Sequence, residues 1–88
     1  MAHHLVPAAP GCVSLTWNRA RRFGRVRVAA WTCHEHRVTF YELCDAGGLS
    51  FIRKTVQDGN RSAVLHSEAW SPAQARVVWI RILAGLAR

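Results

Sequence analysis

The residues best suited to metal chemistry are a run of cysteine, histidine and glutamate in the middle of the chain. Cys33, His34 and His36 occur within four positions, and Cys44 and His66 follow later. Cysteine and histidine are the usual zinc ligands. If that run forms the turn of a hairpin, however, Cys44 lies near the far end of its strand, about 25 Å away at about 3.3 Å per residue. We therefore expect no metal and no other cofactor, and no disulfide between Cys33 and Cys44, since their Cα atoms would exceed the roughly 7 Å limit.

The same run offers a cysteine nucleophile beside two histidines that would act as general bases. Its orienting acid would have to be Glu35, a residue of the expected turn. The chain has no Gly-x-Ser-x-Gly pattern, no phosphate-binding loop and no paired carboxylates, and it holds 5 acidic residues in 88. We expect a protein that is not an enzyme.

Positive charge is the strongest compositional feature. The chain carries 12 basic side chains against 5 acidic ones, a formal net charge of +7, and 11 of the 12 are arginine. The guanidinium group pairs with phosphate and stacks on bases, so this balance favours nucleic acid over a membrane as the partner. The alternative is a genome rich in G and C, which encodes arginine in place of lysine throughout. Five arginines cluster in nine residues: Arg19, Arg21, Arg22, Arg25 and Arg27. Such a run is commonly a solvated linker.

Size and composition indicate one small soluble domain. A chain of 88 residues, of which 50% are hydrophobic, is long enough for one core. No apolar run approaches the roughly 20 residues that a membrane span needs, so we expect no membrane association. Three cysteines and no secretory leader indicate a reducing, cytoplasmic location.

The N-terminal part of the chain has little regular pattern. Its first residues contain two prolines and a glycine without a hydrophobic period, whereas Val13, Leu15 and Trp17 alternate with polar residues. Alternation of this length is typical of a short strand or of an arm lying on a sheet. We divide the chain into a flexible N-terminal tail or arm, residues 1–18, and a single domain, residues 19–88.

A hairpin over residues 38–56 organises the remaining elements. Gly47 and Gly48 join its two apolar-rich runs, and a type I′ turn needs two residues that adopt positive φ. This turn pairs Ala46 with Leu49, Cys44 with Phe51, Leu43 with Ile52, and Glu42 with Arg53. Side chains alternate between the two faces of a sheet. One face therefore carries Thr39, Tyr41, Leu43, Ile52, Lys54 and Val56, and the other carries Phe40, Glu42, Cys44, Phe51 and Arg53.

Two more strands flank this hairpin. Residues 26–33 form the strand before it, and Asp58 with Gly59 is a turn signal that leads into a fourth strand over about residues 60–68. In that strand Ala63 and Leu65 join the Tyr41 face, and Val64 and His66 join the Phe40 face. A loop of even length before residue 38 pairs Val28 with Tyr41, Val26 with Leu43, and Arg27 with Glu42. Arg27, Glu42 and Arg53 then line up across three strands.

Ser71 and Pro72 are the N-cap and first residue of a helix that runs toward Gly85 or Leu86. At about 100° per residue, its apolar positions form one broad stripe; they are Ala75, Val78, Trp79, Ile82, Leu83 and Leu86. We expect this stripe to cover the Tyr41 face of the sheet. Val77, Ile80 and Ala84 remain outside, as a contact for a homodimer or as an accident of composition.

The predicted fold is α+β: a four-stranded antiparallel β-meander with one C-terminal α-helix packed across one face, and a disordered N-terminal tail. This order of elements resembles that of the single-stranded DNA-binding transcriptional coactivators, the Whirly proteins and the PUR repeats. The resemblance is of architecture only. No sequence motif of those families is present, so it transfers no site residue.

The sheet face away from the helix is the candidate binding site, because it interleaves aromatic rings with arginine. It carries Arg25, Arg27, Trp31, Phe40, Phe51, Arg53 and His66, and the charged run adds Arg19, Arg21 and Arg22. Bases stack on such rings while phosphates pair with guanidinium groups, which predicts a small basic protein that binds single-stranded DNA or RNA. The alternative is a homodimeric protein-interaction module with no nucleic-acid role, in which a partner or the N-terminal arm buries this face.

Overall fold

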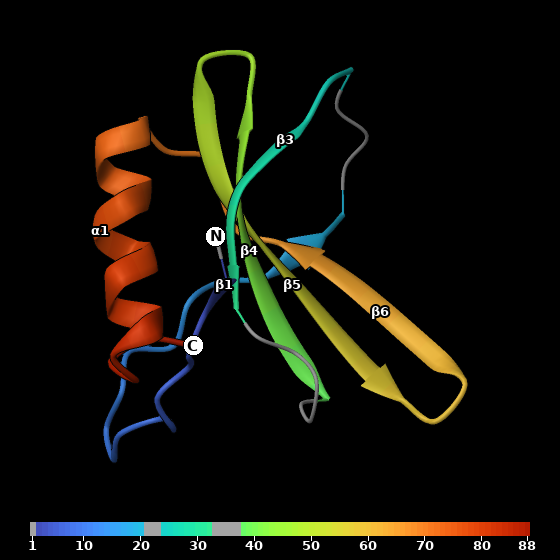
Figure 1. The fold of residues 1–88 in the computed structure, drawn as a ribbon, viewed down its shortest axis with the longest axis vertical. Coiled ribbons are helices and arrows are strands. Elements are labelled where there is room, and N and C mark those ends of the chain that lie inside the picture. The colour runs from blue at the N-terminus through green and yellow to red at the C-terminus, as the bar shows by residue number, and fades with distance from the viewer. Residues whose placement is uncertain (1, 21–23, 33–37) are drawn as a thin grey trace.

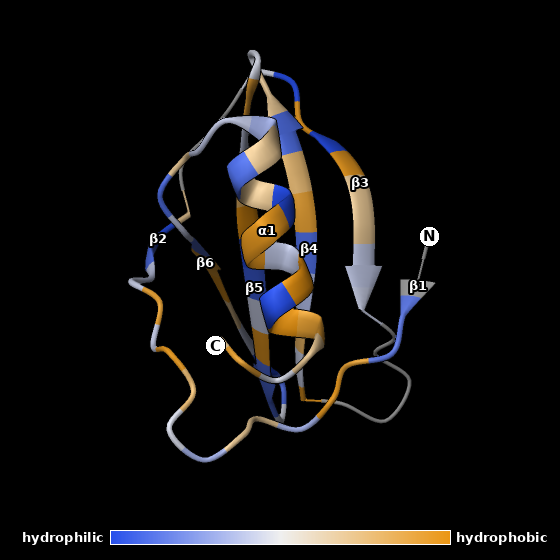
Figure 2. Ribbon diagram, turned by 90° about the vertical axis from the view of Figure 1, so that its left-hand side faces the viewer, coloured by the Kyte–Doolittle hydropathy of each residue, from blue (hydrophilic) through white to orange (hydrophobic). Residues whose placement is uncertain are grey.

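A computed structural model describes residues 2–20, 24–32 and 38–88. They form one sheet and one helix. The strands are β1 Ala2–His3, β2 Asn18–Arg19, β3 Arg27–Thr32, β4 Thr39–Ala46, β5 Leu49–Asp58 and β6 Arg61–His66, and the helix is α1 Pro72–Leu83. The strand order is β1-β3-β4-β5-β6-β2, and α1 crosses one face in front of β4 and β5 (Figures 1 and 2).

The predicted α+β class, antiparallel sheet and C-terminal helix are therefore confirmed. The strand count is corrected, because the sheet has six strands where the sequence predicted four. The two extra strands are two residues each and come from the N-terminal segment. β2 pairs antiparallel with β6, whereas β1 pairs parallel with β3. Strands this short carry no periodicity that sequence reasoning can detect.

The central hairpin has the predicted register. Ala46 faces Leu49, and Glu42 faces Arg53. Gly47 has φ 58° and Gly48 has φ 80°, so both central residues of the turn adopt the left-handed conformation that a type I′ turn requires. The turn chemistry therefore determines which side chains of β4 and β5 share a face.

The pairing of β3 with β4 differs from the prediction. Val28 lies opposite Cys44 and Ala30 opposite Leu43, and the register shifts between them, so that Ala29 forms a β-bulge. The extra residue reverses the faces of the first part of the strand. Arg27 consequently lies on the side of the sheet that α1 covers. Its partner is Asp45 and not Glu42, because the pairing of the whole of β3 with β4 is also shifted from the prediction, which set Val28 opposite Tyr41.

The last hairpin of the sheet turns one residue later than predicted. Asp58 pairs with Arg61, so that Gly59 and Asn60 form the loop. The face assignment is confirmed, since Leu65 lies opposite Lys54 and His66 opposite Arg53. Moving a two-residue turn by one position shifts the strand pairing by two residues, and these faces are unchanged because side-chain direction repeats every two residues.

The N-cap and the packing of α1 are confirmed. The Ser71 hydroxyl accepts a hydrogen bond from the Gln74 amide at 3.3 Å, and Pro72 is the first helical residue. The buried residues of the helix, Ala75, Trp79 and Ile82, join Tyr41, Leu43 and Ile52 in one core. The predicted stripe extends too far at its end, because the helix stops at Leu83 and Leu86 is exposed.

The segment that precedes β2 lies along α1 and its C-terminal extension. The Val6 amide donates to the Leu83 carbonyl at 3.0 Å, the Ala9 amide to Gly85 at 2.8 Å, and the Leu15 amide to Arg88 at 2.9 Å. Leu5 is buried in the core, and Leu15 and Trp17 pack against it. The sequence left open an arm that folds over the face away from the helix; the structure places Leu15 and Trp17 on the helix side instead. We call residues 2–19 the N-terminal arm. Among the described residues, α1 is the one helix, and it is too short to cross a membrane.

Candidate functional site

The sheet face away from α1, here called the distal face, brings together side chains from four strands. Strand pairing sets Trp31 opposite Glu42, Glu42 opposite Arg53, and Arg53 opposite His66. Phe40 is the diagonal neighbour of Trp31 on this face, two residues before Glu42 on β4. The predicted site residues on β3, β4, β5 and β6 are thus neighbours, with the exception of Arg27.

Arg53 is committed to a carboxylate inside this row. Its Nε donates to Glu42 Oε1 at 2.9 Å and its Nη2 to Glu42 Oε2 at 3.1 Å, a bidentate pair. The two side chains are 27% and 19% exposed, and the hydrogen bonds to Glu42 raise the pKa of Arg53 further above its usual value. A phosphate would have to displace Glu42 to use this guanidinium fork. Arg53 therefore fixes the position of Glu42 on the distal face, and its guanidinium group is already occupied by that carboxylate.

The aromatic side chains of the distal face differ in accessibility. Phe51 is 1% exposed and His66 is 6% exposed, and their ring centroids lie 4.6 Å apart. Cys44, next to Phe51 across the hairpin, is fully buried, and burial is the main cause that raises its pKa to about 11. Phe40 is half-buried, whereas Trp31 is 38% exposed. A base can therefore stack on the β3 side of this face but not on Phe51 as it stands.

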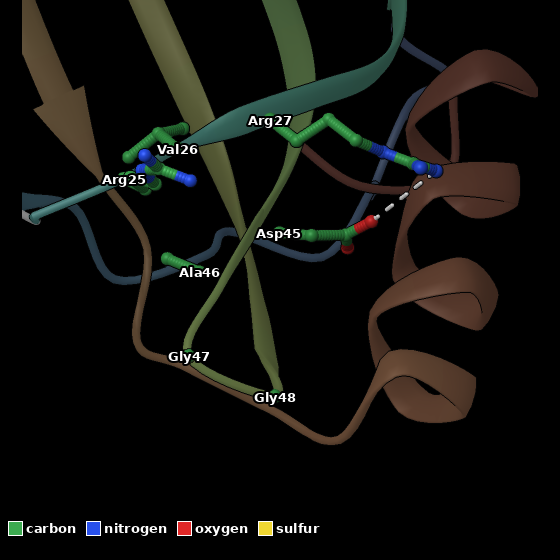
Figure 3. A pocket seen from close by; sticks show the side chains of 7 residues that line it. All are labelled: Arg25, Val26, Arg27, Asp45, Ala46, Gly47 and Gly48. Atoms are coloured by element: carbon green, nitrogen blue, oxygen red, sulfur yellow. Dashed lines mark ion pairs between the residues drawn. The ribbon is translucent and has the colours of Figure 1, made fainter.

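The exposed arginines of the predicted site lie at two edges of the sheet. Arg25 and Arg27 line a cavity of about 440 Å³ beside the Gly47 turn (Figure 3). Arg27 extends toward the helix side, where its Nη2 lies 4.0 Å from Asp45 Oδ2, and its side chain is 78% exposed. Arg25 is exposed and lies on the other side of Val26 from Arg27 in this view (Figure 3). Arg19 is exposed on β2, at the opposite edge of the sheet, and lines a second cavity of about 320 Å³ beside Phe51 and His66.

Two predicted site residues, Arg21 and Arg22, lie outside the described residues, as does the run from Cys33 to His36. Within the described ranges, no group of three or more histidine, cysteine, aspartate and glutamate side chains is arranged to hold a metal ion. Cys44 lies opposite Val28 near the start of β3, while Cys33 follows the end of that strand.

A second constellation, on the helix side, was missed by sequence reasoning. Lys54 Nζ lies 5.1 Å from the centre of the Trp17 ring and 5.8 Å from that of Tyr41, and the Arg88 guanidinium lies 5.9 Å from the Tyr41 ring. Burial, followed by the charge of Arg88, lowers the pKa of Lys54. Burial also raises the pKa of Tyr41, against the opposing effect of Arg88. The available signal was the position of Lys54, the one lysine of the chain, on the inward face of its strand.

Comparisons with models of known protein families, with curated proteins and with solved structures found no match for this chain. The residues and their geometry are therefore the basis for a functional proposal.

Proposed function

We propose that this protein is a small basic binding protein that contacts single-stranded nucleic acid through the β3 side of the distal face. The observation that carries the proposal is Trp31, a large ring that is 38% exposed on a sheet face, with Phe40 as its diagonal neighbour. A ring in this position can stack on any nucleic-acid base, because every base has a flat aromatic face.

An exposed arginine beside β3 supports the same proposal. Arg25 precedes the strand that carries Trp31 and is exposed, whereas Arg27 adds positive charge from the helix side of that strand, where a long, solvent-exposed contact joins it to Asp45. Such exposed pairs contribute little energy and are easily exchanged for a phosphate. With a formal charge of +7 on the chain, nonspecific attraction to a polyanion adds to these contacts.

The test is a titration of the full chain with a fluorescently labelled single-stranded oligonucleotide at about 50 mM and about 200 mM salt. Trp31→Ala should weaken binding by about 1 to 3 kcal/mol at both salt concentrations, because it removes a stacking surface and no charge. Arg25→Gln should weaken binding and reduce the salt slope by about one phosphate contact.

Each variant has a control on the other side of the molecule. Ile80→Ala truncates an exposed apolar side chain of α1, and Arg81→Gln removes an exposed positive charge from the same helix. Ile80→Ala should leave binding unchanged. Arg81→Gln should weaken binding only as much as the loss of one positive charge elsewhere on the surface would. Undetectable binding at about 50 mM salt, or equal effects of Arg25→Gln and Arg81→Gln, would overturn the proposal.

A second function, a homodimeric protein-interaction module, has its own supporting observation. Val77 and Ile80 are 53% and 64% exposed on the outer side of α1, two apolar residues where a helix normally presents polar ones. Sedimentation equilibrium of the wild type and of Ile80→Lys tests it. A dimer that Ile80→Lys converts to a monomer would favour this function, and a wild-type monomer at all concentrations would exclude it.

A further inference from the structure

A cavity of about 380 Å³ opens on the helix side of the sheet, on the face opposite to Trp31. Three parts of the chain that are far apart in sequence build it: the N-terminal arm, the paired strands β4 and β5, and the residue that follows the end of α1 by five positions. Its polar wall consists of Thr39, Tyr41, Lys54 and Arg88, and its apolar wall includes Leu5 and Val56. We call it the Lys54 cavity.

The positive charge of this cavity is not neutralised by any acid among the described residues. The described residues form two ion pairs, Arg27 with Asp45 and Arg53 with Glu42, and none of these four residues lines the cavity. Lys54 contacts the faces of the Trp17 and Tyr41 rings.

In the described part of the chain, the acceptors of the Arg88 guanidinium are backbone carbonyls. Its Nη1 bonds Ile82 O at 2.5 Å and Ala87 O at 3.0 Å, and its Nη2 bonds Val6 O. Two cations thus share one cavity, and both lack a carboxylate partner in the described structure.

Burying two cations together has a cost that an anion would offset. Burial lowers the pKa of Lys54 first, and the nearby charge of Arg88 lowers it further, which shows that the cavity disfavours a second positive charge. Two cations that line one cavity, with no carboxylate partner among the described residues, are the arrangement expected of an anion-binding site.

We propose that the Lys54 cavity binds the anionic group of a small organic acid, a carboxylate or a phosphate monoester, whose apolar part lies against Leu5 and Val56. The Lys54 ammonium supplies the direct hydrogen bonds, since a lysine offers three donors. Arg88 supplies charge from a fixed position, because its guanidinium donors already bond carbonyl groups. A volume of about 380 Å³ lies within the range of small-ligand sites, about 300 to 1,000 Å³.

Calorimetric titration of the full chain with benzoate, phenyl phosphate and the neutral analogue benzyl alcohol tests this site. The two anions should bind and the alcohol should bind at least tenfold more weakly. The preference between benzoate and phenyl phosphate identifies which anion the cavity accepts. Equal binding of the alcohol would overturn the proposal. No binding of either anion at a ligand concentration of about 10 mM would also overturn it, because that concentration nearly saturates a site whose dissociation constant is about 1 mM, which corresponds to about 4 kcal/mol.

Two variants distinguish anion binding in the cavity from a general effect of positive charge on the chain. Lys54→Met should weaken anion binding by about tenfold to a hundredfold, the loss of a hydrogen bond to a charged group. Arg76→Met makes the same change of charge at an exposed residue near the start of α1, which does not line the cavity, and should bind as the wild type does. Equal weakening by both would refute the site. If Lys54→Met does not fold, Val56→Phe provides the second test, because it narrows the cavity with Lys54 intact and should also abolish binding.

A spectroscopic readout follows from the composition. Lys54 is the one lysine of the chain, so ¹³C-lysine labelling gives a single side-chain signal in NMR spectra. Anion binding should shift that signal and raise the pKa of Lys54, whose nearest titratable and charged neighbours are Tyr41 and Arg88. A signal that benzoate and phenyl phosphate leave unchanged would contradict the proposal independently of any variant.

Discussion

Gly85→Ala should release the N-terminal arm from the end of α1. Gly85 has φ 80°, and a methyl group added there would lie 2.3 Å from the Pro7 carbonyl oxygen, far inside the van der Waals contact distance. That oxygen belongs to the backbone of the arm, so the arm itself has to move. Its movement would strain the hydrogen bond from the Val6 amide to Leu83 and that from the Ala9 amide to Gly85, which are 3.0 and 2.8 Å long.

The magnitude follows from two contributions. An L-residue in the left-handed region costs about 1 to 2 kcal/mol. Loss of the two hydrogen bonds adds about 0.5 to 1.5 kcal/mol each, for a total of about 2 to 5 kcal/mol in the free energy of unfolding. Gly47→Ala is the matched control, because Gly47 has φ 58° with nothing within 4 Å of the added methyl group. It should cost only the backbone contribution, about 1 to 2 kcal/mol.

Urea denaturation of the two variants measures this difference, and hydrogen exchange locates it. The reduced freedom of the unfolded chain that alanine brings is common to both variants and cancels. Gly85→Ala should also accelerate exchange of the Val6 and Ala9 amides, while Gly47→Ala leaves them protected. Equal destabilisation by the two variants, with unchanged exchange at Val6 and Ala9, would refute the packing of the arm against the helix end.

Four further predictions concern the core, the Cys44 thiol and metal. Trp79→Ala removes a ring that is 4% exposed and should cost about 3 to 5 kcal/mol, a large part of the total stability of an 88-residue domain, about 4 to 13 kcal/mol; a cooperative melt near the wild-type temperature would contradict the packing of α1. In a chain with Cys44 as its one cysteine, a thiol reagent at pH 8 should react far more slowly in buffer than in denaturant, because the pKa of about 11 keeps the folded thiol protonated; equal rates would show an accessible thiolate. The linked free energy of unfolding should fall as pH rises from about 9 to about 11, since the folded chain retains the proton that the unfolded chain releases. A chelator should leave the melting temperature unchanged, and loss of stability with release of stoichiometric zinc would overturn the prediction that Cys33 and Cys44 share no ion.

Sequence reasoning succeeded where a single local interaction determines the structure. Gly47 and Gly48 fix one turn type, and that turn fixes the register of the whole hairpin. Ser71 and Pro72 fix the start of α1 in the same way. The bulge at Ala29 has no such signal, because alanine neither favours nor forbids an extra residue in a strand, and the face of Arg27 was therefore assigned wrongly.

The candidate site was predictable in composition but not in accessibility. Alternation placed Trp31, Phe51, Arg53 and His66 on one face, and the strand pairing agrees. It carried no information on which of these side chains the rest of the molecule covers, so that the burial of Phe51 and the pairing of Arg53 with Glu42 were visible only in three dimensions. The Lys54 cavity is likewise a product of tertiary structure, since the arm and Arg88 complete it.

The hydrogen bonds between the N-terminal arm and the end of the chain set an order for folding. The Val6 amide bonds Leu83, and the Arg88 guanidinium bonds Val6, a separation of 82 residues. Contacts between residues so far apart in the sequence form late, because the entropic cost of closing the loop has to be met before the contacts stabilise the chain. During synthesis, residues 2–15 leave the ribosome before the sheet. β1 can pair once residues 31–32 of β3 appear, but residues 6–15 meet their hydrogen-bond partners outside the arm only when residues 83–88 appear. The hairpin of β4 and β5 can form meanwhile from local contacts, so residues 6–15 should dock last although they are made before the sheet.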